Sequence, residues 1–258
     1  MRDTFCFVKQ FVKCIARNDW KNCANAIGAG FDINVKTKHG EPLLHVAVRR
    51  GSIKICKLLL NSGAKVNATN DHYETALILA ASKANAKICK LLMAFKASIA
   101  AISKDGRTAL MEAARMKSFE VAEIVKPNFF TDMENTADKD GNTVLHHAVP
   151  CSNKLLELLV CTDVDINAVN NKGWTALTLA FMSSNGGNVL ILAEAEAEFE
   201  VNGVSSWDFA TEEIVEYLAR HQIYEITTIF DPFLYFYDSD VGFDTNDDDT
   251  EAEDGDKN

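Results

Sequence analysis

His45 and His146 are the side chains in this sequence best suited to acid–base chemistry. A catalytic histidine needs a nucleophile or a carboxylate held at a defined geometry. His147, next to His146, points elsewhere on its predicted helix and supplies no such partner. The lone glycine doublet, Gly186-Gly187, lacks the spacing and the strand-to-helix context of a phosphate-binding loop. We therefore expect no catalytic residue, no cofactor and no enzyme.

The cysteines could bind metal or form disulfides, but their spacing favours neither. The seven cysteines are separated by 8, 9, 33, 33, 62 and 10 residues, and none of these gaps matches a zinc-ligand pair. Cys56 and Cys89 fall on the apolar faces of predicted helices, where a free thiol behaves as a small hydrophobic group. We expect buried, reduced cysteines, no metal site, and a location in the cytoplasm, the nucleus or both.

The elements that position these residues recur with a regular period. His45, Ile78 and Met111 occupy the same place in three successive segments, each 33 residues after the last, and Cys56 and Cys89 show the same interval. Each segment reads as a turn, an apolar helix, a short break, a second apolar helix and a glycine stop. A constant period of this length predicts stacked two-helix units, each too small to bury its own apolar face.

Three stretches show the turn and first helix of the pattern: Lys104-Asp-Gly-Arg-Thr-Ala-Leu-Met-Glu-Ala113, Lys139-Asp-Gly-Asn-Thr-Val-Leu-His-His-Ala148 and Asn171-Lys-Gly-Trp-Thr-Ala-Leu-Thr-Leu-Ala180. Over residues 5–224 the chain resembles ankyrin repeat proteins, whose units read Asp-x-x-Gly-x-Thr-Pro-Leu-His-x-Ala-Ala. The resemblance implies an all-α ankyrin-repeat solenoid with hairpin-like turns that binds other proteins. It also implies that His45 and His146 are structural residues, which tie the turn to its neighbour.

The predicted domain spans residues 1–224, with about six or seven repeats and a degenerate copy at each end. The clearest repeats are 36–68, 69–101, 102–135, 136–168 and 169–201. In the last unit, which we interpret as a cap, Thr211 with acidic residues directly after it predicts a helix N-cap. Residues 225–258 form an aromatic and then acidic tail, which we expect to be largely disordered.

Several positions depart from the repeat pattern. Tyr73 and Lys96 stand where the family has glycine, which predicts local strain or a shifted turn. Pro127 and a longer repeat predict a mobile loop at 127–137. Pro150 predicts a short or kinked helix, and Gly186-Gly187 predicts a loose turn between two helices.

The acidity of the chain belongs to its tail. The formal net charge is −11, and residues 225–258 hold 12 acidic residues and one lysine, which leaves residues 1–224 neutral. The acidic segment either acts as a solubilising end or competes for basic surfaces. Thr245 and Thr250 each have an acidic residue three positions later, a pattern that acid-directed kinases favour. The aromatic cluster Phe230–Tyr237 is expected to pack on the last repeat.

By resemblance, the binding surface is the concave side, made of turn tips and first helices. Its variable positions are mostly basic, with tryptophan and methionine among them, which predicts a groove for an acidic protein segment. An ordinary solvated face is the alternative. The predicted protein-binding residues are Lys38, His39, Arg49, Arg50, Asp71, His72, Lys83, Lys104, Arg107, Arg115, Met116, Lys139, Asn142, Lys172, Trp174 and Met182.

Asn67 and Asn167 each follow a leucine by eight residues. This spacing resembles sites where ankyrin asparagines are hydroxylated by an oxygen-sensing dioxygenase. The alternative is that both asparagines satisfy backbone groups in the loops. An intact mass without a 16 Da increment would argue against the modification.

The predicted function is a non-enzymatic adaptor or scaffold that binds protein partners. An inhibitor laid out like the I-kappa-B family, with repeats followed by an acidic tail, is the first alternative. A substrate-receptor subunit of a ubiquitin ligase is the second. We expect a monomer without direct nucleic-acid contact. We also expect no membrane association, because no run of eighteen apolar residues and no secretory signal occurs.

Overall fold

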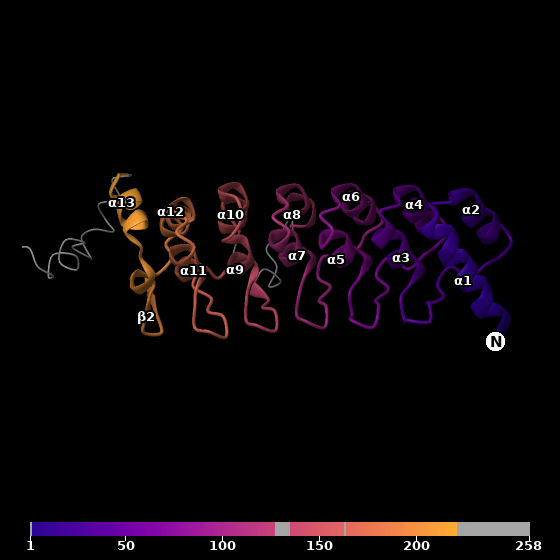
Figure 1. Cartoon of the computed structure of the whole chain (residues 1–258), viewed down its shortest axis with the longest axis horizontal. Helices are drawn as coiled ribbons and strands as arrows, with labels where there is room; N and C mark the ends of the chain where they lie inside the picture. The colour runs from indigo at the N-terminus through magenta and orange to yellow at the C-terminus, as the bar shows by residue number, and fades with distance from the viewer. Residues whose placement is uncertain (1, 127–134, 163, 221–258) are drawn as a thin grey trace, which may run out of the picture. The chain divides into compact units, whose positions relative to one another are not determined.

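The computed structural model describes residues 2–126, 135–162 and 164–220 (Figure 1). The chain divides into two compact units, Met1–Ile214 and Val215–Asn258. Residues 127–134 of the loop predicted at 127–137, the aromatic cluster, the acidic tail, Thr245 and Thr250 lie outside the described residues. None of the helices that the structure describes has the length and apolar character needed to cross a bilayer.

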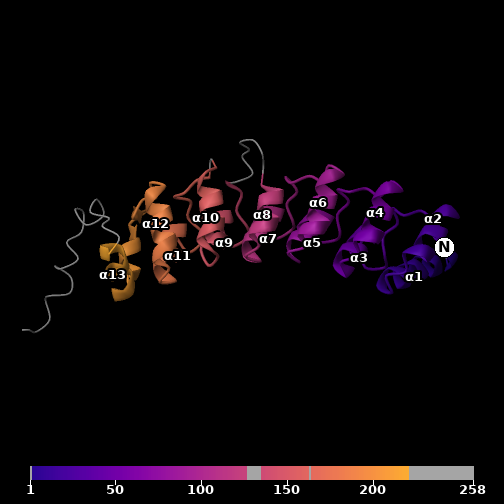
Figure 2. The same ribbon diagram turned by 90° about the horizontal axis from the view of Figure 1, so that it is seen from above.

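The first unit is built from pairs of short helices that follow one another in chain order (Figures 1 and 2). The pairs are α1 (Arg2–Ala16) with α2 (Trp20–Gly28), α3 (Leu43–Arg50) with α4 (Ile53–Asn61), α5 (Ala76–Ala81) with α6 (Ala86–Ala94), α7 (Ala109–Arg115) with α8 (Phe119–Val125), α9 (Val144–Ala148) with α10 (Asn153–Val160), and α11 (Ala176–Met182) with α12 (Gly186–Glu194).

The helices form two layers. The first helices of successive pairs contact one another from α1 through α11, and the second helices do the same from α2 through α12. Leucine, isoleucine, valine and alanine side chains fill the space between the layers, with Leu43, Ile55, Leu77 and Ile88 almost fully buried. The predicted stack of two-helix units is therefore confirmed. Contacts within each pair and between neighbouring pairs together make one continuous core.

Most helices begin at a residue whose side chain accepts a hydrogen bond from the third helical N–H. Thr75, Thr108 and Thr175 cap α5, α7 and α11 in this way, and Ser52 and Asn85 cap α4 and α6. These caps satisfy donors that have no partner inside the helix. Exceptions include α3, where Pro42 takes the threonine position, and α10, where Ser152 makes no side-chain cap.

Left-handed backbone recurs at three places in repeats two, three and six: the hairpin tip, the turn between the helices and the stop after the second helix. Repeat two has Gly40, Gly51 and Gly63 there, and repeat three has Tyr73, Ala84 and Lys96 at φ values of 56°, 50° and 60°. The turns at Tyr73 and Lys96 are thus not shifted. Both residues adopt the conformation that glycine adopts elsewhere, with the strain that a Cβ brings.

One prediction about a turn is wrong. Gly186 and Gly187 form the first turn of α12, which begins after the N-cap Asn185. A Cβ at Gly187 would lie 2.5 Å from Nδ2 of Asn153 in α10. The doublet therefore permits close helix packing instead of loosening a turn. The short helix predicted at Pro150 is confirmed, because α9 has 5 residues and ends at Ala148.

The predicted C-terminal cap follows α12. It contains a two-stranded antiparallel hairpin, β1 (Glu200–Val201) and β2 (Val204–Ser205), then the 3-10 helix η2 (Ser206–Phe209) and α13 (Glu212–Arg220). Asn202 and Gly203 at the turn both have positive φ, as a tight hairpin requires. Thr211 accepts a hydrogen bond from the N–H of Ile214 at 3.4 Å, which confirms the predicted cap.

Candidate functional site: the hairpin tips and first helices

Each repeat begins with a tight hairpin tip that one polar side chain organises. The tips are residues 37–41, 70–74, 103–107, 138–142 and 170–174, and we number them two to six after their repeats. In each tip the first residue donates its N–H to the carbonyl of the fifth residue. Its side-chain oxygen also accepts from backbone N–H groups of the tip: Asp138 from Asp140 and Asn142, and Asn170 from Lys172 and Trp174. The tips are therefore preformed turns.

Successive tips are joined by backbone hydrogen bonds. The N–H of Lys104 donates to the carbonyl of His72 at 2.8 Å, that of Lys139 to Asp105 at 2.9 Å, and that of Asn171 to Asp140 at 3.0 Å. The tips consequently form a row beside the helix pairs (Figure 1). We name the surface made by this row and by the first helices α3, α5, α7, α9 and α11 the tip face.

His45 and His146 tie repeats together. Nε2 of His45 donates to the carbonyl of Glu74 at 2.8 Å, and Nε2 of His146 donates to that of Trp174 at 2.9 Å. Nδ1 of His146 accepts from the N–H of Thr143, whereas Nδ1 of His45 is buried without a partner. Pro42, at the position of Thr143, has no N–H to donate. Burial lowers the pKa of both histidines, which favours the neutral ring.

A second set of side-chain links joins the ends of the repeats. The side-chain oxygens of Asn34, Asn67, Asn135 and Asn167 accept from the N–H groups of Lys65, Ser98, Asp165 and Glu198, respectively, each in the following repeat. Asn67 and Asn167 thus satisfy loop backbone groups, and their hydroxylation remains a prediction. Ala100 occupies the same position between Asn67 and Asn135 and cannot accept such a bond.

The predicted arginines of the tip face are already engaged. Arg49 pairs with Glu41, and Arg50 donates to the carbonyl of Ala16 at 2.7 Å. Lys139 lies 3.6 Å from Asp105. In contrast, Lys38, Lys83 and Lys104 have no ion-pair partner among the described residues. The unpaired positive charge of this surface is therefore carried mainly by lysines, together with Arg50.

Two buried carboxylates bind neighbouring side chains in the middle of the tip face. Glu112 of α7 is 5% exposed and binds Arg115 at 2.7 Å and Arg107 at 3.4 Å. The carboxylate of Asp138 accepts from Nε2 of His147 at 2.9 Å. Met111 and His146 hold the same position in their repeats, and Glu112 and His147 are the residues directly after them. Glu112 and His147 therefore occupy equivalent places on neighbouring first helices. Neither pairing was predicted.

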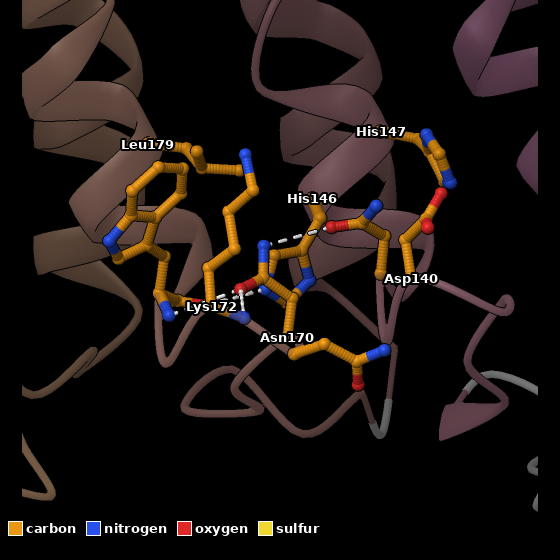
Figure 3. Close-up of a pocket in the computed structure, with 9 residues that line it drawn as sticks. Asp140, His146, His147, Asn170, Lys172 and Leu179 are labelled. Carbon is orange, nitrogen blue, oxygen red and sulfur yellow. Dashed lines mark hydrogen bonds between the residues drawn. The ribbon is translucent and has the colours of Figure 1, made fainter.

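A pocket of about 500 Å³ opens between the fifth and sixth tips (Figure 3). Its walls are polar on one side, where Nδ2 of Asn170 donates to Oδ1 of Asn142 at 3.0 Å. On the other side Nζ of Lys172 lies 4.6 Å from the centroid of the Trp174 ring. The lining residues are Asp140, Asn142, His146, His147, Asn170, Asn171, Lys172, Trp174 and Leu179. Charged, amide and aromatic groups thus converge on one space.

The structure brings together only part of the predicted binding set. Asn142, Lys172 and Trp174 line the pocket. The other tip residues are Lys38, His39, Asp71, His72, Lys104, Arg107 and Lys139. Lys83, Met116 and Met182 lie at or just beyond the C-terminal ends of their helices, away from the tips. Asp105 and Asp140 interleave with the lysines, so the surface is of mixed charge.

The cysteines form no disulfide within the described residues. Burial raises the pKa of Cys23 to about 11 and those of Cys56 and Cys89 to about 12, so these groups stay as thiols at neutral pH. In the part of the chain that the structure describes, His, Cys, Asp and Glu side chains nowhere gather into a group that could hold a metal ion.

The stacked helix pairs and hairpin tips define the class of protein. A family model described as ankyrin repeats (3 copies) matches residues 44–131 and 127–203, more than half of the chain. The chain therefore belongs to the ankyrin repeat family. Ankyrin repeat domains are generally protein–protein interaction modules and are typically non-enzymatic.

Two solved structures illustrate the similarity. The ankyrin repeat domain of Bcl-3, described as a unique member of the IkappaB protein family, matches with a TM-score of 0.68 and 20% identity, over 81% of this chain and 97% of that one. An ankyrin repeat domain from Acinetobacter baumannii AYE matches with a TM-score of 0.67 and 22% identity, over 73% and 98%. At these identities the likeness establishes the fold alone. No curated protein matches the chain significantly.

Proposed function

We propose that this chain is a non-enzymatic adaptor that binds an acidic segment of another protein across the tip face. The pocket between the fifth and sixth tips carries the proposal, because groups from two tips and two first helices converge there. Asp140 and Asn142 come from one tip and Lys172 and Trp174 from the next. Preformed turns need little ordering when a partner binds, which favours affinity.

The charge distribution supports an acidic partner segment. Lys38 and Lys104 are exposed and have no ion-pair partner among the described residues, and Lys172 is exposed beside an aromatic ring. The arginines, held by Glu41 and Glu112, keep further N–H groups but carry less free charge. Complementary charge steers association and selects partners more than it adds affinity.

Quantitative affinity purification from the source cell tests the proposal. The bait is the full chain, and the tip-face variant carries Lys104→Glu with Lys172→Glu. The matched control carries Lys54→Glu with Lys57→Glu, two exposed lysines on α4. We expect the tip-face variant to lose the principal partners at least tenfold and the α4 variant to retain them. Equal recovery with both variants would overturn the proposal.

A tail-dependent inhibitor is the second candidate, since residues 225–258 hold 12 acidic residues and one lysine. A chain of residues 1–224 separates the two functions in the same purification. A basic partner that disappears with the tail, and whose binding falls steeply with salt, would favour the inhibitor. Partners that persist without the tail favour the adaptor.

A further inference from the structure

Tyr73 occupies the one place in a hairpin tip where the other tips have glycine. Gly40, Gly106, Gly141 and Gly173 hold this position with φ between 68° and 78°, and Tyr73 holds it at 56°. A side chain in this left-handed region crowds its own carbonyl group, which disfavours the conformation by about 1–2 kcal/mol. The third tip therefore carries strain that a glycine would relieve.

Glycine has a packing reason in the neighbouring tips. A Cβ at Gly106 would lie 2.8 Å from the carbonyl oxygen of Ala137, and one at Gly141 would lie 2.6 Å from the backbone nitrogen of Asn171. The third tip nevertheless keeps its bond to the next, from Lys104 N–H to the His72 carbonyl at 2.8 Å. The tyrosine is thus accommodated within an unchanged row.

The ring of Tyr73 contributes little to the stack. Tyr73 is 62% exposed, and within the described residues its side chain takes part in no hydrogen bond and no aromatic pair. The other non-glycine residues in left-handed positions of the repeats, such as Ala84, Lys96 and Ser184, lie at helix turns and stops. Tyr73 alone among them places a large ring on the tip row.

The tips on both sides of Tyr73 carry exposed lysines. Lys38 lies in the second tip, which the carboxylate of Asp71 adjoins at Gly40. Lys104 lies in the fourth tip and donates its backbone N–H to the carbonyl of His72. An exposed aromatic ring in a row of tips that also holds unpaired lysines matches a peptide that offers an apolar side chain with carboxylates beside it.

We propose that Tyr73 is an anchoring residue of the tip face, and that it receives an apolar side chain of a short acidic segment in the partner protein. This inference rests on the proposed function and adds the kind of side chain that is recognised. Strained residues persist where function retains them, and here the strain has no packing benefit. The ring would bury the apolar group while Lys38 and Lys104 contact the flanking carboxylates.

A display library of random 12-residue peptides, selected on the full-length protein, tests this inference. Enriched peptides are then synthesised with a fluorescent label, and their affinities are measured by anisotropy. The panel comprises wild type, Tyr73→Gly, Tyr73→Phe, Lys104→Glu and Ala84→Gly. Ala84→Gly is the matched control, because it relieves left-handed backbone in the same repeat, at an exposed residue away from the tips.

We expect enriched peptides to carry an apolar residue flanked by Asp or Glu. Tyr73→Gly should weaken them at least tenfold while raising the melting temperature, whereas Ala84→Gly should raise the melting temperature without changing affinity. Tyr73→Phe should keep most of the affinity. A stabilised variant that binds worse identifies a residue retained for recognition.

Three results would overturn the inference. Affinity that survives Tyr73→Gly but falls with Lys104→Glu would remove the anchor and leave the proposed function standing. Affinity insensitive to both variants, or a selection that enriches no acidic peptide, would remove both. A lower melting temperature for Tyr73→Gly would assign the tyrosine a structural role instead.

Discussion

Repeats two and three reach the same geometry with complementary sets of residues. Repeat two has glycine at all three left-handed positions, Gly40, Gly51 and Gly63, whereas repeat three has Tyr73, Ala84 and Lys96. Repeat three has the helix cap Thr75, whereas repeat two has Pro42 and no side-chain cap. Neither repeat contains the full pattern. The stack therefore imposes a backbone that neither sequence specifies alone, because each repeat is held from both sides.

The largest expected effect tests whether a tip needs glycine because of the adjoining tip. Gly106→Ala places a Cβ against the backbone of Ala137 and Asp138, and should destabilise the protein by about 3 kcal/mol from backbone strain plus overpacking. Gly173→Ala, at φ 76° with nothing within 4 Å, should lose only about 1 kcal/mol. Urea unfolding measures the loss of stability in both variants. Equal losses would show that the left-handed backbone conformation alone determines the cost of the substitution.

The next effect uses pH to compare repeats that have a histidine link with those that do not. Burial lowers the pKa of His45 and His146, so the unfolded state binds protons more readily than the folded state. Their stabilising contribution is present above the unfolded pKa near 6.5 and is lost as pH falls below it, with a slope approaching about 1.4 kcal/mol per pH unit for each histidine.

Urea midpoints between pH 7.5 and pH 5.5 measure this slope. His45→Met places in repeat two the residue type that repeat four has as Met111, and this variant should show about half the wild-type slope. A variant with an undiminished slope would assign the pH dependence to other groups.

A smaller effect concerns the missing cap of repeat two. Pro42→Thr would supply a side-chain cap for α3 and an N–H for the unpartnered Nδ1 of His45, as Thr143 does for His146. We expect a gain of about 1 kcal/mol. Thermal unfolding measures it, and the gain should disappear in the His45→Met background if the new N–H is part of its cause.

The smallest effect restores glycine to repeat three. Ala84→Gly should stabilise the protein by about 0.5 kcal/mol, because relief of left-handed strain outweighs the added freedom of the unfolded chain. Ala81→Gly, in the last turn of α5, is the control and should destabilise by about 1 kcal/mol or more. A loss of stability in Ala84→Gly would mean that the stack removes the strain entirely.

Sequence periodicity predicted the parts of the fold that repeat. The helix pairs, the short helix before Pro150 and the linking roles of His45 and His146 all follow from local pattern or resemblance. Contacts between elements did not follow. Nδ2 of Asn188 donates to the carbonyl of Val149, which has no helical partner because α9 ends early, and Sγ of Cys151 lies 3.0 Å from the carbonyl of Ala114. Such contacts depend on how neighbouring repeats are aligned with each other, which a local sequence pattern does not specify.

The sequence indicated which residues lie at the tips, but it overestimated the unpaired positive charge of the candidate site. The sequence alone locates the tips, because each tip is a turn, and it identifies Lys172 and Trp174 as candidate protein-binding residues. It does not show that Glu112 binds both Arg107 and Arg115, or that Glu41 binds Arg49. Counting basic residues along a surface therefore overestimates its free charge when acidic partners lie in the same repeat.

The links between repeats have a consequence for how the molecule comes apart. Repeats two and three are joined by both a histidine and an asparagine, His45 and Asn67. At the next junction the equivalent positions are Ile78 and Ala100, so both side-chain links are absent and the backbone bond from Lys104 to His72 remains. Cooperativity in a linear array depends on coupling between neighbours. Under mild denaturation the chain should part between its third and fourth repeats, leaving two independently melting blocks where one transition would otherwise be seen.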